Sequence, residues 1–333
     1  MVRVAFLGPF GTYSHQAALQ QFPSENTTFI PQNTISDCFA QLSSDDSIEY
    51  AVVPLENSTN GQVVFTYDLL RDALVESQDS ETSLTTSNIE IVAEQYVSID
   101  LCLIAPAEID LFSSDRPKIG RVYSHPQVWG QAAQYLKKLE EKVGPLDKVD
   151  ASSTSGALKL CCDSYRNNTE FMDLAIAGRA AAAAHGGIII DAPINDKKGN
   201  TTRFLVLARK SLNRVLLQPL PPVDGEQQKI TLIAFTAEPD KPGSLVDVLT
   251  VFKEHGLNMC SIASRPFHPQ VNNGKTTPTN SQQELQHKWQ YIFFVEICDR
   301  EENDWNSISR YIAELTCSYR IWGTFYRSGG YYK

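Results

Sequence analysis

Short apolar runs alternate with helical segments along the N-terminal part of the chain, and this alternation constrains the fold more than any other feature. Val2 to Leu7 predicts a strand, and Ser14 to Phe22 predicts the helix that follows it. Tyr50 to Pro54 predicts another strand, ahead of a helix over Asp68 to Val75. Chains in which strands and helices alternate form α/β folds, and the alternation predicts parallel sheets.

A second α/β unit is expected from about Lys118 onward. Arg121 to Tyr123 predicts a strand, and Pro126 to Leu139 predicts a helix with proline in its first turn. A short strand, an alanine-rich helix and another strand follow, at Leu174–Gly178, Arg179–His185 and Ile188–Ile190. Between the two units, Ile89 to Ile104 has strand-like apolar content, and the polar segment from Glu76 to Asn88 is expected to form a surface loop.

A different order of elements follows the Pro- and Gly-containing segment Leu216 to Gln228, which we interpret as an interdomain linker. The downstream pattern is β-α-β-β-α-β, the ferredoxin-like order. Its elements are expected at Lys229–Thr236, Gly243–Gly256, Leu257–Phe267, Trp289–Ile297 and Asp304–Leu315, with a last strand to about Tyr326. The polar segment 268–286 is expected to be a loop inserted between the second and third strands.

Length and composition exclude several classes of protein. A chain of 333 residues is long enough for two or three domains, and its formal net charge of -10 argues against nucleic-acid or anionic-membrane binding. The sequence has no signal-peptide pattern at its N-terminus and no apolar run that predicts a membrane span. The 7 cysteines are scattered without a CxxC pair, which indicates a reducing, cytoplasmic environment. No HExxH pattern is present, and we expect neither a metal nor another cofactor.

Four polar clusters lie at predicted strand ends or the adjacent turns, where α/β sheets bind ligands. They are GPFGTYS (8–14), PLENSTNGQV (54–63), YSHPQVWGQ (123–131) and GNTTRFLVLAR (199–209). Taken singly, the first is a strand-helix turn capped by Thr12 or Ser14. The second has five hydrogen-bonding side chains in a row at a strand end, which favours a ligand site over a polar loop. In the third, Gln131 is expected about two turns into a helix. Together the clusters are rich in neutral hydroxyls and amides and poor in general bases, which suits an anionic, oxygen-rich small molecule held by positioned hydrogen bonds.

An acyl-transfer hydrolase that uses Ser124 and His125 is a competing hypothesis. Adjacent residues in a strand-turn point apart, and the sequence has no G-x-S-x-G elbow. A nucleophilic serine is therefore not expected.

The four clusters are similar, in the same order, to the four signatures of prephenate dehydratase, and KPGSLVDVL and SIASRPF resemble its ACT regulatory domain. The resemblance covers nearly the whole chain, and the long inserts are similar to those of fungal members. It implies that prephenate loses CO2 and its ring hydroxyl to give phenylpyruvate, in phenylalanine biosynthesis, without a redox cofactor. No helical chorismate mutase domain precedes the first strand, so a monofunctional enzyme is expected.

The resemblance also implies a domain layout. A catalytic domain over 1–210 would resemble the two-lobed type 2 periplasmic binding proteins. Its first lobe is expected at about 1–104 plus 190–210, and its second lobe at about 105–189. A linker over 211–228 and an ACT domain over 229–333 complete the chain.

Site residues follow from the same resemblance. Thr202 is expected to donate a hydrogen bond to the departing hydroxyl, and Arg203 to pair with a substrate carboxylate. Three residues are expected to bind or orient the substrate: Asn57, Ser124 and Gln131. Five more are expected in or next to the site: Glu56, Ser58, Thr12, Ser14 and Phe204.

In the C-terminal domain the resemblance implies a site for L-phenylalanine as an allosteric inhibitor. Its expected residues are Gly243, Ser244, Leu245, Ser264, Arg265 and Pro266. Ala263 stands where the family has a glutamate, so the site lacks a partner for the effector's ammonium group or for Arg265. ACT domains pair their sheets, and a homodimer or tetramer is expected.

Two alternatives stay open. Arogenate, in place of prephenate, would add an amino group and call for an acidic partner in the site. A non-catalytic sensor with an amino-acid-binding ACT domain is the alternative from another class, but a mere binder would not need the sequence Thr202-Arg203-Phe204.

Overall fold

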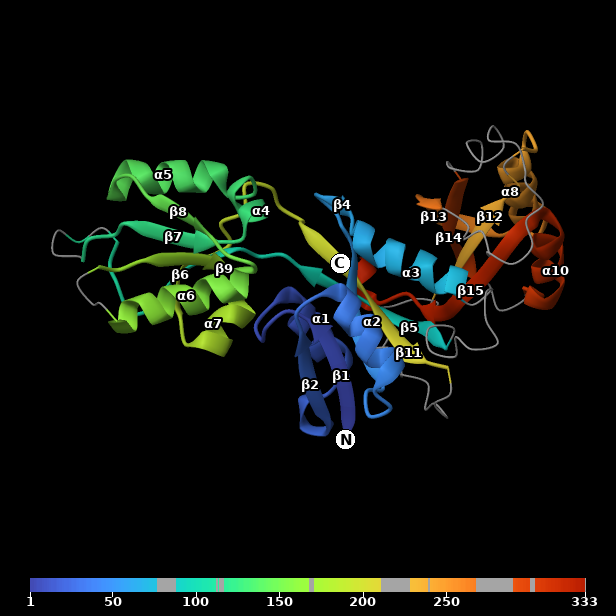
Figure 1. Cartoon of the computed structure of the whole chain (residues 1–333). Coiled ribbons are helices and arrows are strands. Elements are labelled where there is room, and N and C mark those ends of the chain that lie inside the picture. The colour runs from blue at the N-terminus through green and yellow to red at the C-terminus, as the bar shows by residue number, and fades with distance from the viewer. Residues whose placement is uncertain are drawn as a thin grey trace, which may run out of the picture. The chain divides into compact units, whose positions relative to one another are not determined.

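The computed structural model describes residues 1–76, 88–111, 113, 117–167, 171–210, 228–238, 240–267, 290–299 and 303–332. The chain, drawn in Figure 1, divides into two compact units. The first unit comprises Met1–Cys38, Val52–Gln62 and Gln95–Phe204, and the second comprises Phe39–Ala51, Val63–Glu94 and Leu205–Lys333. The expected loop after Glu76, nearly all of the expected linker and the expected insertion over 268–286 lie outside the described residues.

A six-stranded sheet has the order β2-β1-β3-β11-β5, with β4 paired to β3. Its strands are β1 (Val2–Leu7), β2 (Thr27–Gln32), β3 (Tyr50–Asn57), β4 (Gly61–Gln62), β5 (Ile89–Ser98) and β11 (Thr201–Arg209). The strand expected to end at Pro54 continues to Asn57, because Glu56 and Asn57 pair with Gln62 and Gly61 of β4. The strand end that carries the second polar cluster is therefore part of a hairpin.

The first unit contains a five-stranded sheet in the order β10-β6-β9-β7-β8. Its strands are β6 (Cys102–Ala105), β7 (Arg121–Ser124), β8 (Asp147–Asp150), β9 (Leu174–Ala177) and β10 (Ile188–Asp191). β7 pairs with β8 and β9 in parallel, whereas β6 pairs with β9 and β10 in antiparallel fashion. The expected parallel pairing is confirmed for β7, β8 and β9, whereas it fails for β6, which enters this sheet in the opposite direction to β9.

Helices cover both faces of this sheet, with α5 on one side and α6 and α7 on the other (Figure 1). Successive side chains of a strand point to opposite faces. Accordingly Leu103 packs in the cluster that contains Leu136 of α5 (Ala133–Val143), while Ile104 packs with Leu158 of α6 (Thr154–Asn167). The apolar run of each strand is thus divided between two helical layers, with α7 (Arg179–His185) beside α6.

The prediction of a single helix over 126–139 was wrong, because the structure has two helices there. α4 (Pro126–Trp129) is capped by Gly130, and α5 starts at Ala133. The Asp196 carboxylate accepts hydrogen bonds from the backbone N–H groups of Gln134 and Tyr135, which satisfies the start of α5. Gln131 consequently lies in the turn between the helices, not two turns into a helix.

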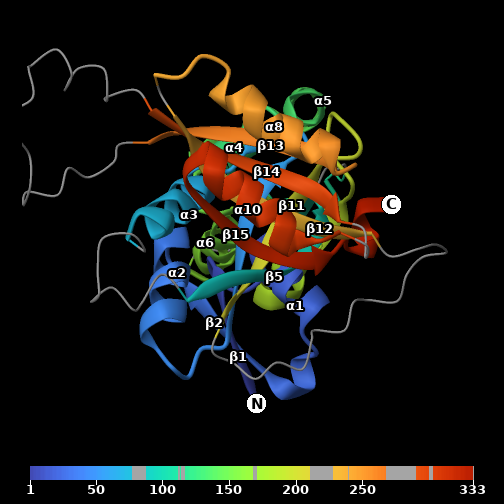
Figure 2. The same ribbon diagram turned by 90° about the vertical axis from the view of Figure 1, so that its right-hand side faces the viewer.

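The second unit contains a four-stranded antiparallel sheet in the order β13-β14-β12-β15. Its elements run β12 (Lys229–Ala237), α8 (Ser244–Glu254), β13 (Asn258–Phe267), β14 (Gln290–Asp299), α10 (Trp305–Leu315) and β15 (Thr316–Tyr326). Val248 of α8 and Ile308 of α10 pack into one apolar core with Phe235 of β12, so both helices cover the same face (Figure 2). The expected ferredoxin-like order is confirmed.

The remaining helices are α1 (Tyr13–Gln21), α2 (Ile35–Ser44) and α3 (Val64–Glu76), with short 3₁₀ turns at Ser24–Asn26 and Gly329–Tyr332. α3 begins four residues earlier than the expected Asp68. None of the helices in the described part of the chain has the length and apolarity needed to cross a membrane.

Candidate functional site

Asn57 and Thr202 come together from two neighbouring strands. Asn57 ends β3, Thr202 is the second residue of β11, and Asn57 Nδ2 donates to Thr202 Oγ1 over 2.9 Å. A hydroxyl that accepts a hydrogen bond in this way directs its own hydrogen elsewhere. The hydrogen of the Thr202 hydroxyl is therefore available to an acceptor other than Asn57.

The orientation of the Asn57 amide is fixed from both ends. Its Oδ1 accepts from the backbone N–H groups of Thr59 and Asn60 at 3.0 and 2.9 Å. Its Nδ2 is thereby directed toward β11, where it also donates to the Thr201 carbonyl over 3.2 Å.

Asn200 belongs to this cluster although the sequence analysis did not select it. Its buried side chain accepts from Asn57 Nδ2 over 2.7 Å and donates to Gln131 Oε1 over 3.2 Å. In the sequence, Gly199 and Asn200 form a Gly-Asn pair, which is typical of a turn and does not by itself predict a binding site. The available signal was an amide two residues before the expected catalytic threonine, directly ahead of the strand that carries it.

Ser58 joins the same two segments through the backbone. Its N–H donates to the Thr201 carbonyl over 2.8 Å, and its Oγ accepts from the Thr201 N–H over 2.9 Å and donates to the Gly199 carbonyl over 3.2 Å. The contacts hold the start of β11 against the end of β3.

Arg203 and Glu56 form an ion pair, with Arg203 Nη1 2.9 Å from Glu56 Oε1. The Arg203 side chain is only 4% exposed, whereas that of Glu56 is 38% exposed. Phe204 is buried and anchors the strand immediately after them. The guanidinium that was expected to bind a substrate carboxylate is therefore already paired with a carboxylate of the protein.

Ser124 and His125 lie beside each other in sequence but have separate partners. Ser124 is fully buried and its Oγ donates to the Ile176 carbonyl over 2.7 Å. His125 Nδ1 accepts from the Gln127 N–H and so caps α4, and burial lowers the pKa of this histidine. Neither contact prepares Ser124 for nucleophilic attack.

Thr12 and Ser14 lie at the start of α1. Thr12 Oγ1 accepts from the His15 N–H over 3.3 Å and is the N-cap of the helix, and Ser14 is buried. The interpretation of this cluster as a capped strand-helix turn is confirmed for Thr12. In the part of the chain that the structure describes, neither Thr12 nor Ser14 is hydrogen-bonded to Asn57 or Thr202.

The six expected effector residues lie on two elements of the second unit. Gly243 precedes α8, and Ser244 and Leu245 form its first turn. Ser264, Arg265 and Pro266 lie toward the end of β13.

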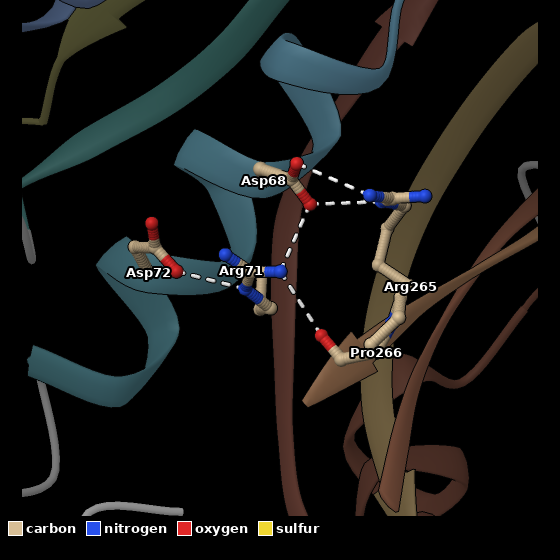
Figure 3. Close-up of polar contacts among 5 residues, drawn as sticks. All are labelled: Asp68, Arg71, Asp72, Arg265 and Pro266. Atoms are coloured by element: carbon tan, nitrogen blue, oxygen red, sulfur yellow. Dashed lines mark hydrogen bonds and ion pairs between the residues drawn. The ribbon is translucent and has the colours of Figure 1, made fainter. Parts of the chain in front are cut away.

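Arg265 is held by α3 (Figure 3). Its Nε and Nη2 donate to the two carboxylate oxygens of Asp68 at 2.8 and 3.2 Å. Arg71 donates to the same carboxylate over 2.9 Å and to the Pro266 carbonyl over 3.0 Å. Asp68 thus supplies the carboxylate partner that Ala263 does not provide.

Within the described residues, no group of three or more His, Cys, Asp or Glu side chains is arranged to hold a metal ion. The site around Thr202 consists of amides, hydroxyls and one ion pair.

The sequence comparisons identify one family. The model of the family described as prephenate dehydratase matches residues 4–212. A probable prephenate dehydratase from Saccharomyces cerevisiae is 44% identical, over 99% of this chain and 98% of the yeast chain.

Solved structures show the same fold. Prephenate dehydratase from Arthrobacter aurescens, in complex with L-Phe, has a TM-score of 0.71 at 22% identity, covering 99% of this chain and 91% of that chain. A quorum-quenching acylase has a TM-score of 0.69 at 23% identity, covering 98% of each chain. The expected fold class is confirmed: an α/β region of the periplasmic-binding-protein type, followed by a βαββαβ domain.

A family model that covers most of the α/β region, together with 44% identity over nearly the full length, establishes the relationship: this chain belongs to the prephenate dehydratase family.

Proposed function

We propose that this protein catalyses the decarboxylative dehydration of prephenate to phenylpyruvate. The contact that carries the proposal is the one between Asn57 Nδ2 and Thr202 Oγ1, because it leaves the hydrogen of the Thr202 hydroxyl free to bond the departing oxygen of the substrate. Prephenate is an oxygen-rich dianion, and a site that offers neutral hydrogen-bond donors suits such a substrate better than a site arranged for covalent catalysis would.

The reaction needs no electron acceptor. The electron pair of the bond to the ring carboxylate moves into the ring as CO2 leaves, the ring becomes aromatic, and the ring hydroxyl departs with its electron pair. Thr202 donates a hydrogen bond to the departing oxygen and stabilises its developing negative charge. A threonine is too weak an acid to transfer its proton outright without a relay, so stabilisation is the role we assign.

Asn57 and Gln131 orient the substrate and Thr202 in this proposal. Both present amides, and both contact the Asn200 side chain. We keep Arg203 as a carboxylate partner that acts together with Glu56, since a substrate carboxylate would share a guanidinium already bound on one side. We keep Ser124 and Thr12 in supporting roles, because their side chains hold local backbone, and we place Ser14 beside them as a buried residue at the start of α1.

Purified protein incubated with prephenate, with phenylpyruvate followed by its absorbance in base, tests the function. Turnover well above a protein-free control is the expected result. Well-folded protein that forms no product would refute the proposal.

The same assay with arogenate distinguishes the two substrates. Glu56 precedes Asn57 in the chain, and its carboxylate is paired with Arg203, so it is not set aside for a substrate ammonium. We therefore expect a higher kcat/KM for prephenate, and faster turnover of arogenate would reverse this assignment.

We also propose feedback inhibition by L-phenylalanine through the C-terminal domain. Ser264, Arg265 and Pro266 on β13 and Gly243, Ser244 and Leu245 at α8 form the proposed site. The effector's carboxylate would compete with Asp68 for Arg265, because a guanidinium binds a carboxylate in the same bidentate geometry.

Asp68→Asn should make inhibition more sensitive. The substitution removes the competing charge, so we expect the L-phenylalanine concentration for half-inhibition to fall roughly two- to fivefold, in the range of a partly exposed ion pair. Initial rates at increasing L-phenylalanine concentration measure this. Asp72→Asn is the matched control, since Asp72 binds Arg71, whereas the carboxylate that binds Arg265 is that of Asp68. Equal sensitivity of the D68N, D72N and unmodified proteins would contradict the competition.

Three further proposals concern the whole chain. We propose the domain boundaries given above, 1–210 for the catalytic domain and 229–333 for the ACT domain. We propose a homodimer or tetramer, supported by the edge strand β13, on which Met259 and Ile262 are 40% and 45% exposed. Light scattering of the purified protein tests the oligomer.

We propose a cytoplasmic location, supported by the 7 cysteines, all of which are free.

A further inference from the structure

Asn200 links two groups that approach the site from different segments. One is Asn57, at the end of β3, and the other is Gln131, in the turn between α4 and α5. Its side chain is buried, with one oxygen bound to Asn57 Nδ2 and one nitrogen bound to Gln131 Oε1. A side-chain amide is the group that supplies an acceptor and a donor from one planar end.

We propose that Asn200 is a positioning residue for this reaction, which fixes the side chains of Asn57 and Gln131 in their working orientations. The inference rests on the proposed function. Through Asn57, Asn200 also sets the direction of the Thr202 hydroxyl, because the same Asn57 nitrogen donates to both Asn200 Oδ1 and Thr202 Oγ1.

The effect on Gln131 follows from amide geometry. Gln131 uses Oε1 to accept from Asn200, so its Nε2 points to the opposite side of the amide and is the end that can donate to substrate oxygens. The Gln131 backbone is held separately, since its carbonyl accepts from the Asp196 N–H over 2.8 Å. The contact with Asn200 therefore decides the side-chain orientation and not the path of the turn.

The backbone of Asn200 is also anchored independently of its side chain. Its carbonyl accepts from the Ile99 N–H over 2.8 Å. Substitutions that change only the side chain leave this bond available, which makes the positioning role accessible to mutagenesis.

Two substitutions separate the two contacts. Asn200→Asp keeps an acceptor for Asn57 but loses the donor for Gln131, so we expect KM to rise about tenfold while kcat changes by less than about threefold. Asn200→Leu loses both contacts, and we expect kcat to fall about tenfold or more in addition. A N200L protein that keeps the unmodified kcat would overturn the link to Thr202.

A double-mutant cycle with Gln131→Leu tests whether N200D acts through Gln131. If it does, N200D should change KM by no more than about twofold in the Q131L background, because the partner is already absent. Charge repulsion between the introduced carboxylate and the substrate would instead persist there. An equal increase of KM in both backgrounds would overturn the proposal.

Asn195→Asp is the control for a merely structural amide. Asn195 bridges backbone in a similar way, accepting from the Leu101 N–H and donating to the Ile99 carbonyl, each over 2.8 Å. We expect N195D to lower the Tm without the KM increase of N200D.

The experiment also distinguishes this inference from the proposed function. If the unmodified protein does not turn over prephenate, both fail. If it is active and N200D matches it in KM, only the positioning role fails. Should N200D not fold, Q131L removes the same hydrogen bond from the other end, and an unchanged KM of that variant would equally overturn the inference.

Discussion

Replacing Thr202 with valine is expected to lower kcat by about a hundredfold to a thousandfold while the fold is retained. Valine has nearly the same shape as threonine but no hydroxyl. The loss removes the donor to the departing oxygen, and one such donor contributes roughly 2.7–4 kcal/mol to transition-state stabilisation. Steady-state kinetics with prephenate measure the change.

Thr201→Val is the matched control for this experiment. Thr201 is the neighbouring residue of β11, and adjacent side chains of a strand point to opposite faces. We expect T201V to keep kcat within about threefold of the unmodified protein. A T202V protein with near-normal kcat would show that another group stabilises the departing hydroxyl.

Replacing Gly323 with alanine is expected to destabilise the second unit severely. A Cβ at Gly323 of β15 would lie 2.1 Å from the carbonyl oxygen of Ile91 in β5. Both strands would have to move apart, because the clash is with backbone and not with a flexible side chain. We expect the free energy of unfolding to fall by about 3 kcal/mol or more, at the upper end for overpacked positions.

Thermal denaturation followed by circular dichroism measures this prediction. Gly120→Ala is the control, since a Cβ at that position meets no heavy atom within 4 Å. A clear fall in Tm is expected for G323A and not for G120A. Similar melting temperatures for the two variants would mean that β15 and β5 are less closely packed than the structure indicates.

Local patterns in the sequence predicted much of the fold. The strand Val2–Leu7 and the helix Arg179–His185 were predicted at their observed bounds, because each is short, apolar or alanine-rich, and ended by glycine. The βαββαβ order of the C-terminal domain was equally readable from its periodicity. Periodicity is a local property, so it serves elements whose boundaries are set locally.

Elements whose ends depend on distant partners were predicted less well. β3 continues through the polar residues Glu56 and Asn57 because β4 pairs with them, and polarity alone suggested a loop. The helix expected over 126–139 is interrupted between Trp129 and Ala133. Its second part, α5, starts where the Asp196 carboxylate caps it. Asp196 is 62 residues from Gln134, so no local pattern announces this cap.

The candidate site shows the same division. The polar clusters identified Asn57 and Thr202 as candidates, but their contact spans 145 residues of sequence and is seen only in the structure. Asn200 was passed over because its neighbours suggested a turn, and its role depends on two residues 143 and 69 positions away. The partner of Arg265 was equally hidden, since Asp68 lies 197 residues before it.

The hydrogen-bonded network around Thr202 also determines how the site responds to pH. It consists of the side-chain amides of Asn57, Asn200 and Gln131 and the Thr202 hydroxyl. None of these groups gains or loses a proton near neutral pH. The alignment of Thr202 is therefore the same in weakly acidic and weakly basic solution. Any steep dependence of turnover on pH in that range must arise in the substrate or in groups outside this network.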